Sequence, residues 1–438
     1  MISAELWRGL DMEYSIFGRI SDNWKYCKIG DVVNLRQGLQ ISSKRRVSEE
    51  LDGYIPLLKI TDLPKGKFSE YVTDIKEQYV AVKEDIIYTR TGQVGLVYTD
   101  VEGCVHNNCF KVEYNSNQLD KMFLFYYLNN KYFKELANNV ASGSVQKDLT
   151  HSSFKTLPFA FPEISLQKKI SSILFSLDKK ININLSINSD LEQIAQTLFK
   201  RWFIDFEFPN ENGEPYQSSG GKMVESELGL IPEGWNVLNF NKFVQSISES
   251  INKKSKESAI FLNTSDILEG KVLKKSYSPT KEMPGQAKKL IKKNDILYSE
   301  IRPANKRFAY VDFDANDYVV STKLMVLRAD EDIFPSKVLY LYLKNEDTIN
   351  KLQQIAETRS GTFPQITFKQ LSQFIFAIPE KEQFTKNYAI LKNIVDHQLS
   401  LMQEIERLKE LRDILLPKLL SGEIEIPTES EELEHVQL

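Results

Sequence analysis

Apolar residues recur at alternating spacings of four and three in two long stretches of the chain. The first runs from Glu163 to about Phe203 and the second from Glu380 to about Leu420, with one proline, Pro417, near the end of the second. The repeated apolar positions are Leu177, Ile181, Leu191, Ala195, Leu198, Trp202, Ile394, Leu401, Ile405, Leu408, Leu415 and Leu419, with Asn184, Asn188, Gln398 and Arg412 as polar exceptions. This spacing is the heptad repeat of a coiled coil. A helix of about 40 residues extends ~60 Å and has to bury such a stripe. The pattern therefore predicts two long helices that pair with each other and hold the flanking domains apart.

The chain contains the same order of landmarks twice. EDIIYTR (residues 84–90) corresponds to NDILYSEIR (294–302), and FAFPE (159–163) corresponds to FAIPE (376–380). The offset between the copies rises only from 210 to 217 residues between these two pairs. Repeats of about 20 to 50 residues indicate a solenoid. A period near 210 indicates two whole domains, each followed by its own long helix.

Each copy has the same predicted succession of elements. Short β-rich runs separated by turn residues predict a mixed sheet. A single helix follows, over about residues 119–140 in the first copy and 335–356 in the second, then a loop with a Ser-Gly pair and a final strand. The expected fold class is therefore α/β in the mixed sense, with two tandem domains.

A segment rich in Gly, Ser and Asn, NENGEPYQSSGGKM, separates the two copies and is typical of an interdomain linker. The expected organisation is a first domain at 1–162, a long helix at 163–205, the linker at 206–228, a second domain at 229–379, a second long helix at 380–420 and an acidic tail at 421–438.

Composition places the chain among soluble globular proteins, with 42% hydrophobic and 26% charged residues. The net charge is −4, but the stretch from Glu423 to Leu438 holds six Glu and no Lys or Arg, and without it the net charge becomes +2. The overall sign therefore does not exclude a nucleic-acid partner. An odd number of cysteines, three, and no apolar run of membrane length or secretory signal favour a reducing, cytoplasmic location.

The sequence gives little support for a catalytic or metal site. Cys104, His106 and Cys109 have ligand-like spacing, but a structural zinc site needs four ligands and the second copy has neither Cys nor His there. The triplet Glu269–Lys271 has no counterpart with a carboxylate in the first copy, so a turn between strands is favoured. The chain has no phosphate-binding glycine loop ahead of a helix and only four His, so we expect no catalytic residues, metal or cofactor in it.

Polar and basic loops are duplicated instead. RTGQVG follows a strand in the first copy and SEIRPANKR follows the corresponding strand in the second; SGSVQKD and RSGTFPQ form a second loop, and SKRR and KKSK add charge at matching places. Arg, Gln and Asn suit base edges, and Lys suits phosphates. The candidate DNA-binding residues are Lys44, Arg45, Arg46, Arg90, Thr91, Gln93, Ser142, Ser144, Gln146, Lys147, Lys253, Lys254, Arg302, Asn305, Lys306, Arg307, Arg359, Thr362 and Gln365. A repeated scaffold with unlike loops is expected to recognise two unlike sequences.

The combination of motifs resembles the specificity subunit of type I restriction-modification systems, over nearly the whole chain. The motifs that carry the resemblance are LDKKININLSINSDLEQIAQTLFKRWFIDFEFP (177–209), IPEGW (231–235) and LLPKLLSGEIEI (415–426). One departure is that PEKEQFTKN (379–387) lacks the hydrophobic residues found at Ile164 and Ile170 of the first copy. We therefore expect the two helix starts to bind partner subunits unequally.

The resemblance implies a pseudo-twofold protein that recognises DNA without an active site of its own. Two target-recognition domains would each bind one half of a split, asymmetric site in double-stranded DNA, spaced by an antiparallel coiled coil. Two modification (methyltransferase) subunits would carry S-adenosylmethionine, and restriction subunits would cleave DNA after translocation driven by ATP, with Mg²⁺.

Two other functions remain open from the residues alone. One is a non-catalytic scaffold whose two modules, on a coiled-coil spacer, bind polypeptides or glycans. The other is an enzyme with an unrecognised site between the two copies. DNA retention that weakens steeply with salt would favour DNA recognition over both, because phosphate contacts release counterions.

Overall fold

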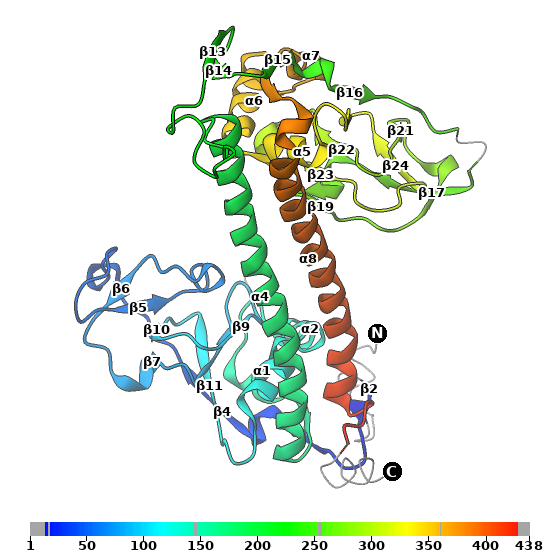
Figure 1. The fold of residues 1–438 in the computed structure, drawn as a ribbon. Coiled ribbons are helices and arrows are strands. Elements are labelled where there is room, and N and C mark those ends of the chain that lie inside the picture. Colours follow the sequence, from blue (N-terminus) through cyan, green and yellow to red (C-terminus); the bar gives the residue numbers. More distant parts are fainter. Residues whose placement is uncertain (1–13, 16–17, 144–146, 253–255, 360, 428–438) are drawn as a thin grey trace, which may run out of the picture. The chain divides into compact units, whose positions relative to one another are not determined.

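The computed structural model of the chain describes residues 14–15, 18–143, 147–252, 256–359 and 361–427 (Figure 1). Contacts divide the chain into two units, residues 1–183 with 406–438 and residues 184–405. Each unit contains one copy of the duplicated sequence together with one end of each long helix. The predicted mixed α/β class with two tandem domains is confirmed.

Unit 1 contains two four-stranded sheets. One has the order β4-β11-β8-β9 and is antiparallel throughout. The other has the order β6-β5-β10-β7, in which β5 and β10 are parallel. β3 pairs with β12, and β1 with β2. The strands are β1 Tyr14–Ser15, β2 Gly18–Arg19, β3 Lys25–Lys28, β4 Val33–Gln37, β5 Ile55–Leu58, β6 Tyr71–Val72, β7 Val80–Ala81, β8 Ile86–Thr89, β9 Val97–Tyr98, β10 Gly103–Val105, β11 Cys109–Tyr114 and β12 Pro158–Phe161.

Unit 2 repeats these sheets strand for strand. The orders are β16-β25-β22-β23 and β20-β17-β24-β21, with β17 and β24 as the parallel pair, and β15 pairs with β26. The strands are β13 Met223–Ser226, β14 Gly229–Pro232, β15 Trp235–Asn239, β16 Val244–Ile247, β17 Ser258–Leu262, β18 Ile267–Leu268, β19 Lys271–Val272, β20 Ser278–Pro279, β21 Ala287–Leu290, β22 Ile296–Ser299, β23 Phe308–Tyr310, β24 Tyr318–Ser321, β25 Leu324–Ala329 and β26 Ile375–Pro379. The predicted mixed sheet is present in each unit, and a second, antiparallel sheet accompanies it, which the sequence did not predict because a run of short strands does not show which strands pair.

The helix predicted after the strands of each copy is two helices. In unit 1 these are α1 (Lys121–Asn129) and α2 (Lys131–Val140), and Asn130 between them accepts a hydrogen bond from the Phe133 N–H at 2.9 Å. The backbone of Asn130 is extended, so its side chain caps α2 rather than continuing α1. In unit 2 the helices are α5 (Ser336–Lys344) and α6 (Glu346–Arg359), separated by Asn345. The apolar periodicity hid both breaks because it continues across the cap.

Aromatic residues fill the core between the helices and the antiparallel sheet of each unit. In unit 1 the ring of Tyr88 on β8 lies 5.4 Å from Phe110 on β11 and 5.0 Å from Phe154 on α3 (His151–Lys155). Unit 2 has a corresponding core and a short helix α7 (Phe368–Leu371). The segment expected to be a linker is folded onto this core, since Phe208 stacks on Trp235 at 5.3 Å.

The two long helices are α4 (Ile164–Phe203) and α8 (Lys381–Ser421), of 40 and 41 residues (Figure 1). Arg412 contacts Asp178 in unit 1, and Asn184 contacts Glu404 in unit 2, so residue numbers fall along one helix as they rise along the other. The helices are therefore antiparallel, and the twelve apolar positions of the heptad pattern are all buried or half-buried. Within the described ranges, no helix is both long enough and apolar enough to cross a bilayer.

Candidate nucleic-acid interface

In unit 1 the loop after β8 forms a tight turn that presents Gln93 to solvent. The buried Thr89 hydroxyl donates to the carbonyl of Gln93 at 2.5 Å and accepts from the Leu96 N–H at 2.9 Å. Gly92 and Gly95 have φ values of 77° and 91°, which only glycine adopts easily. The turn is thus fixed from inside by a strand residue, while the Gln93 side chain is exposed.

The loop between α2 and α3 lies directly against this turn. The Arg90 guanidinium contacts the Asp148 carboxylate at 2.6 Å and donates to the Leu149 carbonyl at 3.2 Å. Thr91 Oγ1 donates to the same carboxylate at 2.8 Å, and the Gly92 N–H donates to the Lys147 carbonyl at 2.9 Å. The structure therefore brings together the two loops that the sequence singled out. The side chain of Arg90 is only 20% exposed and holds the two loops to each other.

A third segment, the turn between β10 and β11, packs against these two loops. We call the three segments together the loop cluster of the unit. The N–H groups of Arg90 and Thr91 donate to the carbonyl of Asn108, at 2.8 and 3.4 Å. The side chain of Gln37 donates to the neighbouring Asn107 carbonyl at 2.5 Å. Sequence reasoning missed this turn because it contributes main-chain carbonyls, which no residue pattern reveals; the only signal was the polar run HNN between two apolar strands.

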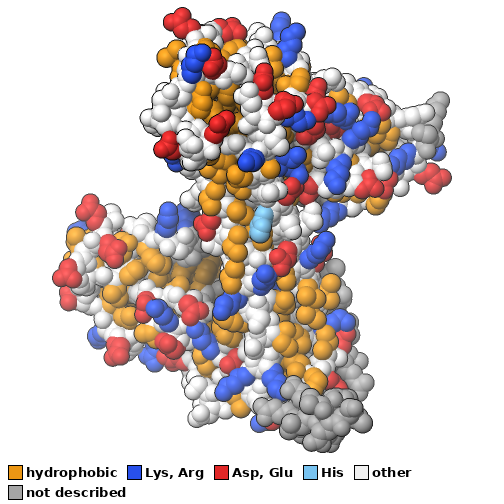
Figure 2. Space-filling view, viewed as in Figure 1, with side chains coloured by type: hydrophobic (Ala, Val, Ile, Leu, Met, Phe, Trp, Pro, Cys, Tyr) orange, Lys and Arg blue, Asp and Glu red, His pale blue; other side chains and the backbone are white. Residues whose placement is uncertain are grey.

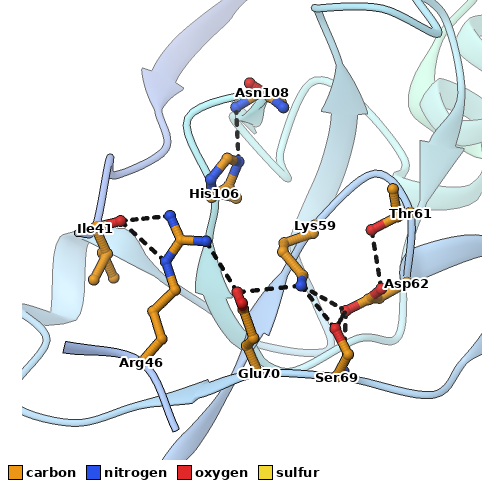
Figure 3. A network of polar contacts seen from close by, with 9 residues as sticks. All are labelled: Ile41, Arg46, Lys59, Thr61, Asp62, Ser69, Glu70, His106 and Asn108. Carbon is orange, nitrogen blue, oxygen red and sulfur yellow. Dashed lines mark hydrogen bonds and ion pairs between the residues drawn. The ribbon is translucent and has the colours of Figure 1, made fainter. Parts of the chain in front are cut away.

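A network of charged side chains lies near His106 of that turn (Figure 3). Arg46 donates to the Ile41 carbonyl and contacts Glu70 at 3.0 Å, and Lys59 contacts Glu70 at 3.1 Å. Burial favours a raised pKa for Glu70, but the bonds from Lys59 and Arg46 outweigh it and lower that pKa. Burial, together with Arg46 and Lys59, lowers the pKa of His106, which therefore stays neutral near pH 7. Arg46 is engaged within the domain.

Unit 2 builds the same cluster from its own loops. The Glu300 N–H donates to the Lys323 carbonyl at 3.0 Å, and the Ile366 N–H donates to the Glu300 carbonyl at 2.9 Å. The Arg302 N–H donates to the Pro364 carbonyl at 3.1 Å. The first two bonds reproduce, position for position, bonds that hold the three segments of unit 1 together. The three-segment cluster is thus a duplicated backbone frame.

The charges on this frame differ between the units. Glu300 occupies the position of Arg90, and Lys323 occupies that of Asn108. In unit 1 the cation of Arg90 pairs with Asp148, whereas in unit 2 the Glu300 carboxylate lies 3.6 Å from the Lys323 ammonium. The sequence pairs the loop 90–95 with the loop 299–307 and does not show that Glu300 is the counterpart of Arg90. The two frames therefore differ in the sign of charge at a shared anchoring position.

The basic loop of unit 2 divides into exposed and engaged residues. Arg302 and Asn305 are exposed; Arg302 has a φ of 43°, and its guanidinium donates one weak hydrogen bond, at 3.4 Å, to the Thr362 carbonyl. Lys306 forms an ion pair with Glu346, and Arg307 donates to a main-chain carbonyl at the start of β18 at 2.9 Å. Arg302 and Asn305 are therefore the residues of this loop that present polar surface to a ligand.

The exposure of the candidate DNA-binding residues divides them into three groups. Exposed side chains are Lys44, Arg45, Gln93, Ser142, Arg302, Asn305 and Thr362. Half-buried side chains are Arg46, Arg90, Thr91, Lys147, Lys306, Arg307 and Gln365. Outside the described residues lie Ser144, Gln146, Lys253 and Lys254, and the side chain of Arg359. Among described residues, no hydrogen bond or ion pair joins Lys44 or Arg45 to the loop cluster.

The cysteine pair with ligand-like spacing lies inside unit 1. Cys104 and Cys109 are buried, and burial raises the pKa of the Cys104 thiol to about 11 and that of Cys109 to about 12. Both thiols are therefore protonated at neutral pH, while metal binding needs the thiolate. Across the part of the chain that the structure describes, no three His, Cys, Asp or Glu side chains gather as metal ligands.

Comparison with known proteins agrees with this architecture. The family model "Type I restriction modification DNA specificity domain" matches residues 21–193 and 232–411. The HindI specificity subunit of Haemophilus influenzae is 41% identical over 176 residues, which are 40% of this chain and 38% of that subunit. The MjaIX specificity subunit of Methanocaldococcus jannaschii is 24% identical over 93% of this chain and 95% of its own length.

A solved structure shares the fold. The S subunit of a type I restriction-modification system from M. genitalium superposes with a TM-score of 0.63 at 14% identity, over 94% of this chain and 99% of that one. The family model covers each copy of the duplication in turn, and both copies carry the three-segment frame. The chain therefore belongs to the family of type I restriction-modification DNA specificity subunits.

Proposed function

We propose that this chain selects the DNA target of a type I restriction-modification complex. Each unit binds one half of a bipartite, asymmetric target through its three-segment loop cluster. The observation that carries the proposal is the duplicated backbone frame with exchanged side chains, because one frame with two surfaces suits two different half-targets. The exposed groups at the frame, such as Gln93 and Arg302, have the chemistry of base readers.

The second part of the proposal concerns partner subunits, which the long helices hold. Three isoleucines on α4, Ile183, Ile187 and Ile194, are 39–48% exposed. Figure 2 shows hydrophobic side chains gathered along α4 on the face in view. Exposed apolar surface of this kind is typical of protein interfaces. Modification subunits with S-adenosylmethionine and restriction subunits with ATP and Mg²⁺ would supply the chemistry, and the chain itself would be non-catalytic.

The test is to express the chain with its modification subunit in a host without DNA methylation and to map methylated bases over the genome. We expect one motif with two specified parts separated by an unspecified gap. The matched control expresses the modification subunit without this chain, and it should leave the genome unmethylated. A methylated motif that is independent of the chain would contradict the proposal. So would methyl transfer or nicking of DNA by the rigorously purified chain alone.

A further inference from the structure

A partly buried charge network joins three helices within unit 2. Lys344 is the last residue of α5, and its side chain is 10% exposed. Its ammonium forms an ion pair with Glu192 on α4 and lies 3.3 Å from the Gln398 side-chain oxygen on α8. The same ammonium lies 5.1 Å from the centre of the Tyr340 ring. One side chain of the recognition domain therefore contacts both long helices.

Side-chain amides extend this network. Gln398 and Gln196 donate to the Glu192 carboxylate at 2.9 and 3.0 Å. Gln196 also donates to the Leu341 carbonyl of α5 at 3.2 Å and accepts from the Asn345 amide at 2.7 Å. Both oxygens of Glu192 are thus occupied, and the network links α5 and its end to α4 and α8.

The network is connected to the loop cluster of unit 2 through α6. Asn345 accepts from the Asp347 N–H at 2.9 Å, so the residue that bonds α4 also starts α6. Gln353 on α6 accepts from the Ala304 N–H at 3.1 Å, inside the basic loop. Lys306 of the same loop pairs with Glu346 in the first turn of α6. The orientation of this loop relative to the long helices therefore depends on how α5 and α6 are seated.

Apolar packing also holds the recognition domain to the long helices. Phe203 of α4 packs on Trp235 and Phe384 in one continuous core. A pocket of about 520 Å³ borders the network and is lined by Glu192 and Lys344 among others. At this end of α5 the directional polar bonds of Lys344 and Asn345 therefore add to the apolar packing of Leu339 and Leu341 and fix where the end of the helix lies.

The energetics of the network favour a role in geometry over a role in stability. Burial lowers the pKa of Lys344, which reflects the penalty of removing an ammonium from water. A buried ion pair contributes little net stability compared with apolar residues of similar size, but it restricts geometry because both charges must remain paired.

Unit 1 has its own network at the contact of the corresponding three helices. Asp178 on α4 accepts from the Tyr126 hydroxyl of α1 at 2.8 Å and from Arg412 of α8 at 2.9 Å. These residues do not correspond in sequence to those of unit 2. Each unit thus joins its own recognition-domain helix, α1 or α5, to α4 and α8 with a different set of charged and polar side chains.

We infer that Glu192, Lys344 and Gln398 are positioning residues that set the gap length accepted between the two half-targets, by fixing the second recognition domain on the helix pair. The inference rests on the proposed function. It adds that gap selectivity depends on this network, separately from the sequence of either half-target. Loosening the network should let the loop cluster of unit 2 reach bases at neighbouring spacings.

The experiment compares variants in the complete complex by methylation mapping, because a genome offers every gap length at once. Lys344→Met removes the cation, and Lys344→Met with Glu192→Leu replaces the pair by apolar groups that should fold as well as the wild type. Both should raise methylation at gaps one base pair away by about tenfold, the factor expected for one charged hydrogen bond. The half-target sequences should stay the same. Glu192→Lys with Lys344→Glu, which reverses the pair, should restore a single gap.

Lys337→Met is the matched control, because it removes an ion pair between α5 and Asp396 of α8 that lies outside the network. It should leave the gap distribution unchanged. A folded double apolar variant that keeps the wild-type gap distribution would overturn the inference, as would equal relaxation in the control. If the wild-type complex itself recognises no bipartite motif, the proposed function fails instead, so the two failures are distinguishable.

Discussion

Within each loop cluster, residues that hold the frame differ from residues that face solvent. Arg90 is committed to Asp148 and to a main-chain carbonyl, whereas Gln93 and Arg302 are exposed. The sequence could predict that these residues lie on loops, but not which of them bond within the domain. That division depends on partners such as Asp148, which are 58 residues away in the chain. The ability to read a base is therefore a property of the folded cluster.

Substitution of one residue in either cluster is expected to affect one half-target. Arg90→Ala should loosen the two loops of unit 1 and relax or abolish recognition of that half, and Arg302→Ala should act on the other half. A bidentate base contact is worth about 1 to 3 kcal/mol, while loss of a phosphate contact weakens all sequences alike. The loss of recognition of each half-target is measured by binding of the complex to duplexes altered in one half at a time. Equal losses on unrelated DNA would show that the residue is a phosphate clamp.

The charge state of His106 gives a pH-dependent contribution to the stability of unit 1. Its pKa is lowered from the ordinary 6.5 in the folded protein by burial and by Arg46 and Lys59. The unfolded chain therefore binds the proton more readily, so stability is fully present above about pH 7 and falls as pH decreases toward about 5. His106→Gln should flatten this dependence in thermal unfolding followed from pH 5 to 8. His397→Gln, which alters an exposed histidine on α8, is the control and should keep the wild-type slope.

At the scale of elements, the sequence predicted the long helices from their apolar periodicity but did not predict the breaks within shorter helices. The heptad stripes at 177–202 and 394–419, together with the runs without proline that follow each Pro-Glu, predicted α4 and α8 to within a residue or two, because apolar spacings of three and four over 26 residues fit only a helix. The breaks at Asn130 and Asn345 were missed, since a single capping side chain interrupts a helix without changing the apolar pattern. Strand pairing, and with it the third segment of each loop cluster, depends on contacts distant in sequence.

Asn184 is the polar exception that the helix pair buries most completely. It is 0% exposed, its amide donates to Glu404 at 2.9 Å, and its side-chain oxygen has no hydrogen-bond partner among described residues. An unsatisfied buried polar atom costs about 1 to 3 kcal/mol, and a buried Asn in a coiled coil fixes register at the expense of stability. Asn184→Leu should therefore raise the midpoint of thermal unfolding while permitting slipped pairings.

The half-buried Asn188 provides the comparison for this substitution. Its side-chain oxygen, like that of Asn184, is buried without a hydrogen-bond partner among the described residues, so Asn188→Leu should also raise the unfolding midpoint, but by less, because the rest of the side chain is partly exposed. Light scattering on the same samples would detect new oligomers formed by slipped helices. A lower midpoint for Asn184→Leu would mean that its bond to Glu404 outweighs the unsatisfied oxygen.

At the scale of the whole molecule, the duplication preserves the frame and the length of the helices while it changes the surfaces. The long helices differ by one residue in length, and both sheets of each copy keep the same strand order. The charges at the anchoring positions and the polar networks at the helix contacts are unlike. A conserved scaffold with different surface side chains fits a protein whose two domains are held in the same way but prefer different DNA sequences. The helix pair is therefore expected to measure the gap between the half-targets.

Insertion of four residues after Ile187 in α4 and after Leu401 in α8 should lengthen the gap between half-targets by one or two base pairs. These points lie at one level of the antiparallel pair, between the contact of Asn184 with Glu404 and that of Gln398 with Glu192, so both contacts survive. Four residues add ~6 Å to a helix and rotate the remainder of that helix by about 40°.

One base pair adds ~3.4 Å and about a tenth of a turn, so the rotation matches one base pair and the translation nearly two. Methylation mapping with the insertion variant should therefore show both half-target sequences unchanged and a longer gap, with some loss of affinity because four extra residues disturb the heptad register locally. Insertion in α4 alone is the control and should abolish activity, since the helices could then no longer keep their contacts at both levels. An unchanged gap in a folded double insertion would mean that the helix pair does not measure the spacing and serves only as a surface for partner subunits.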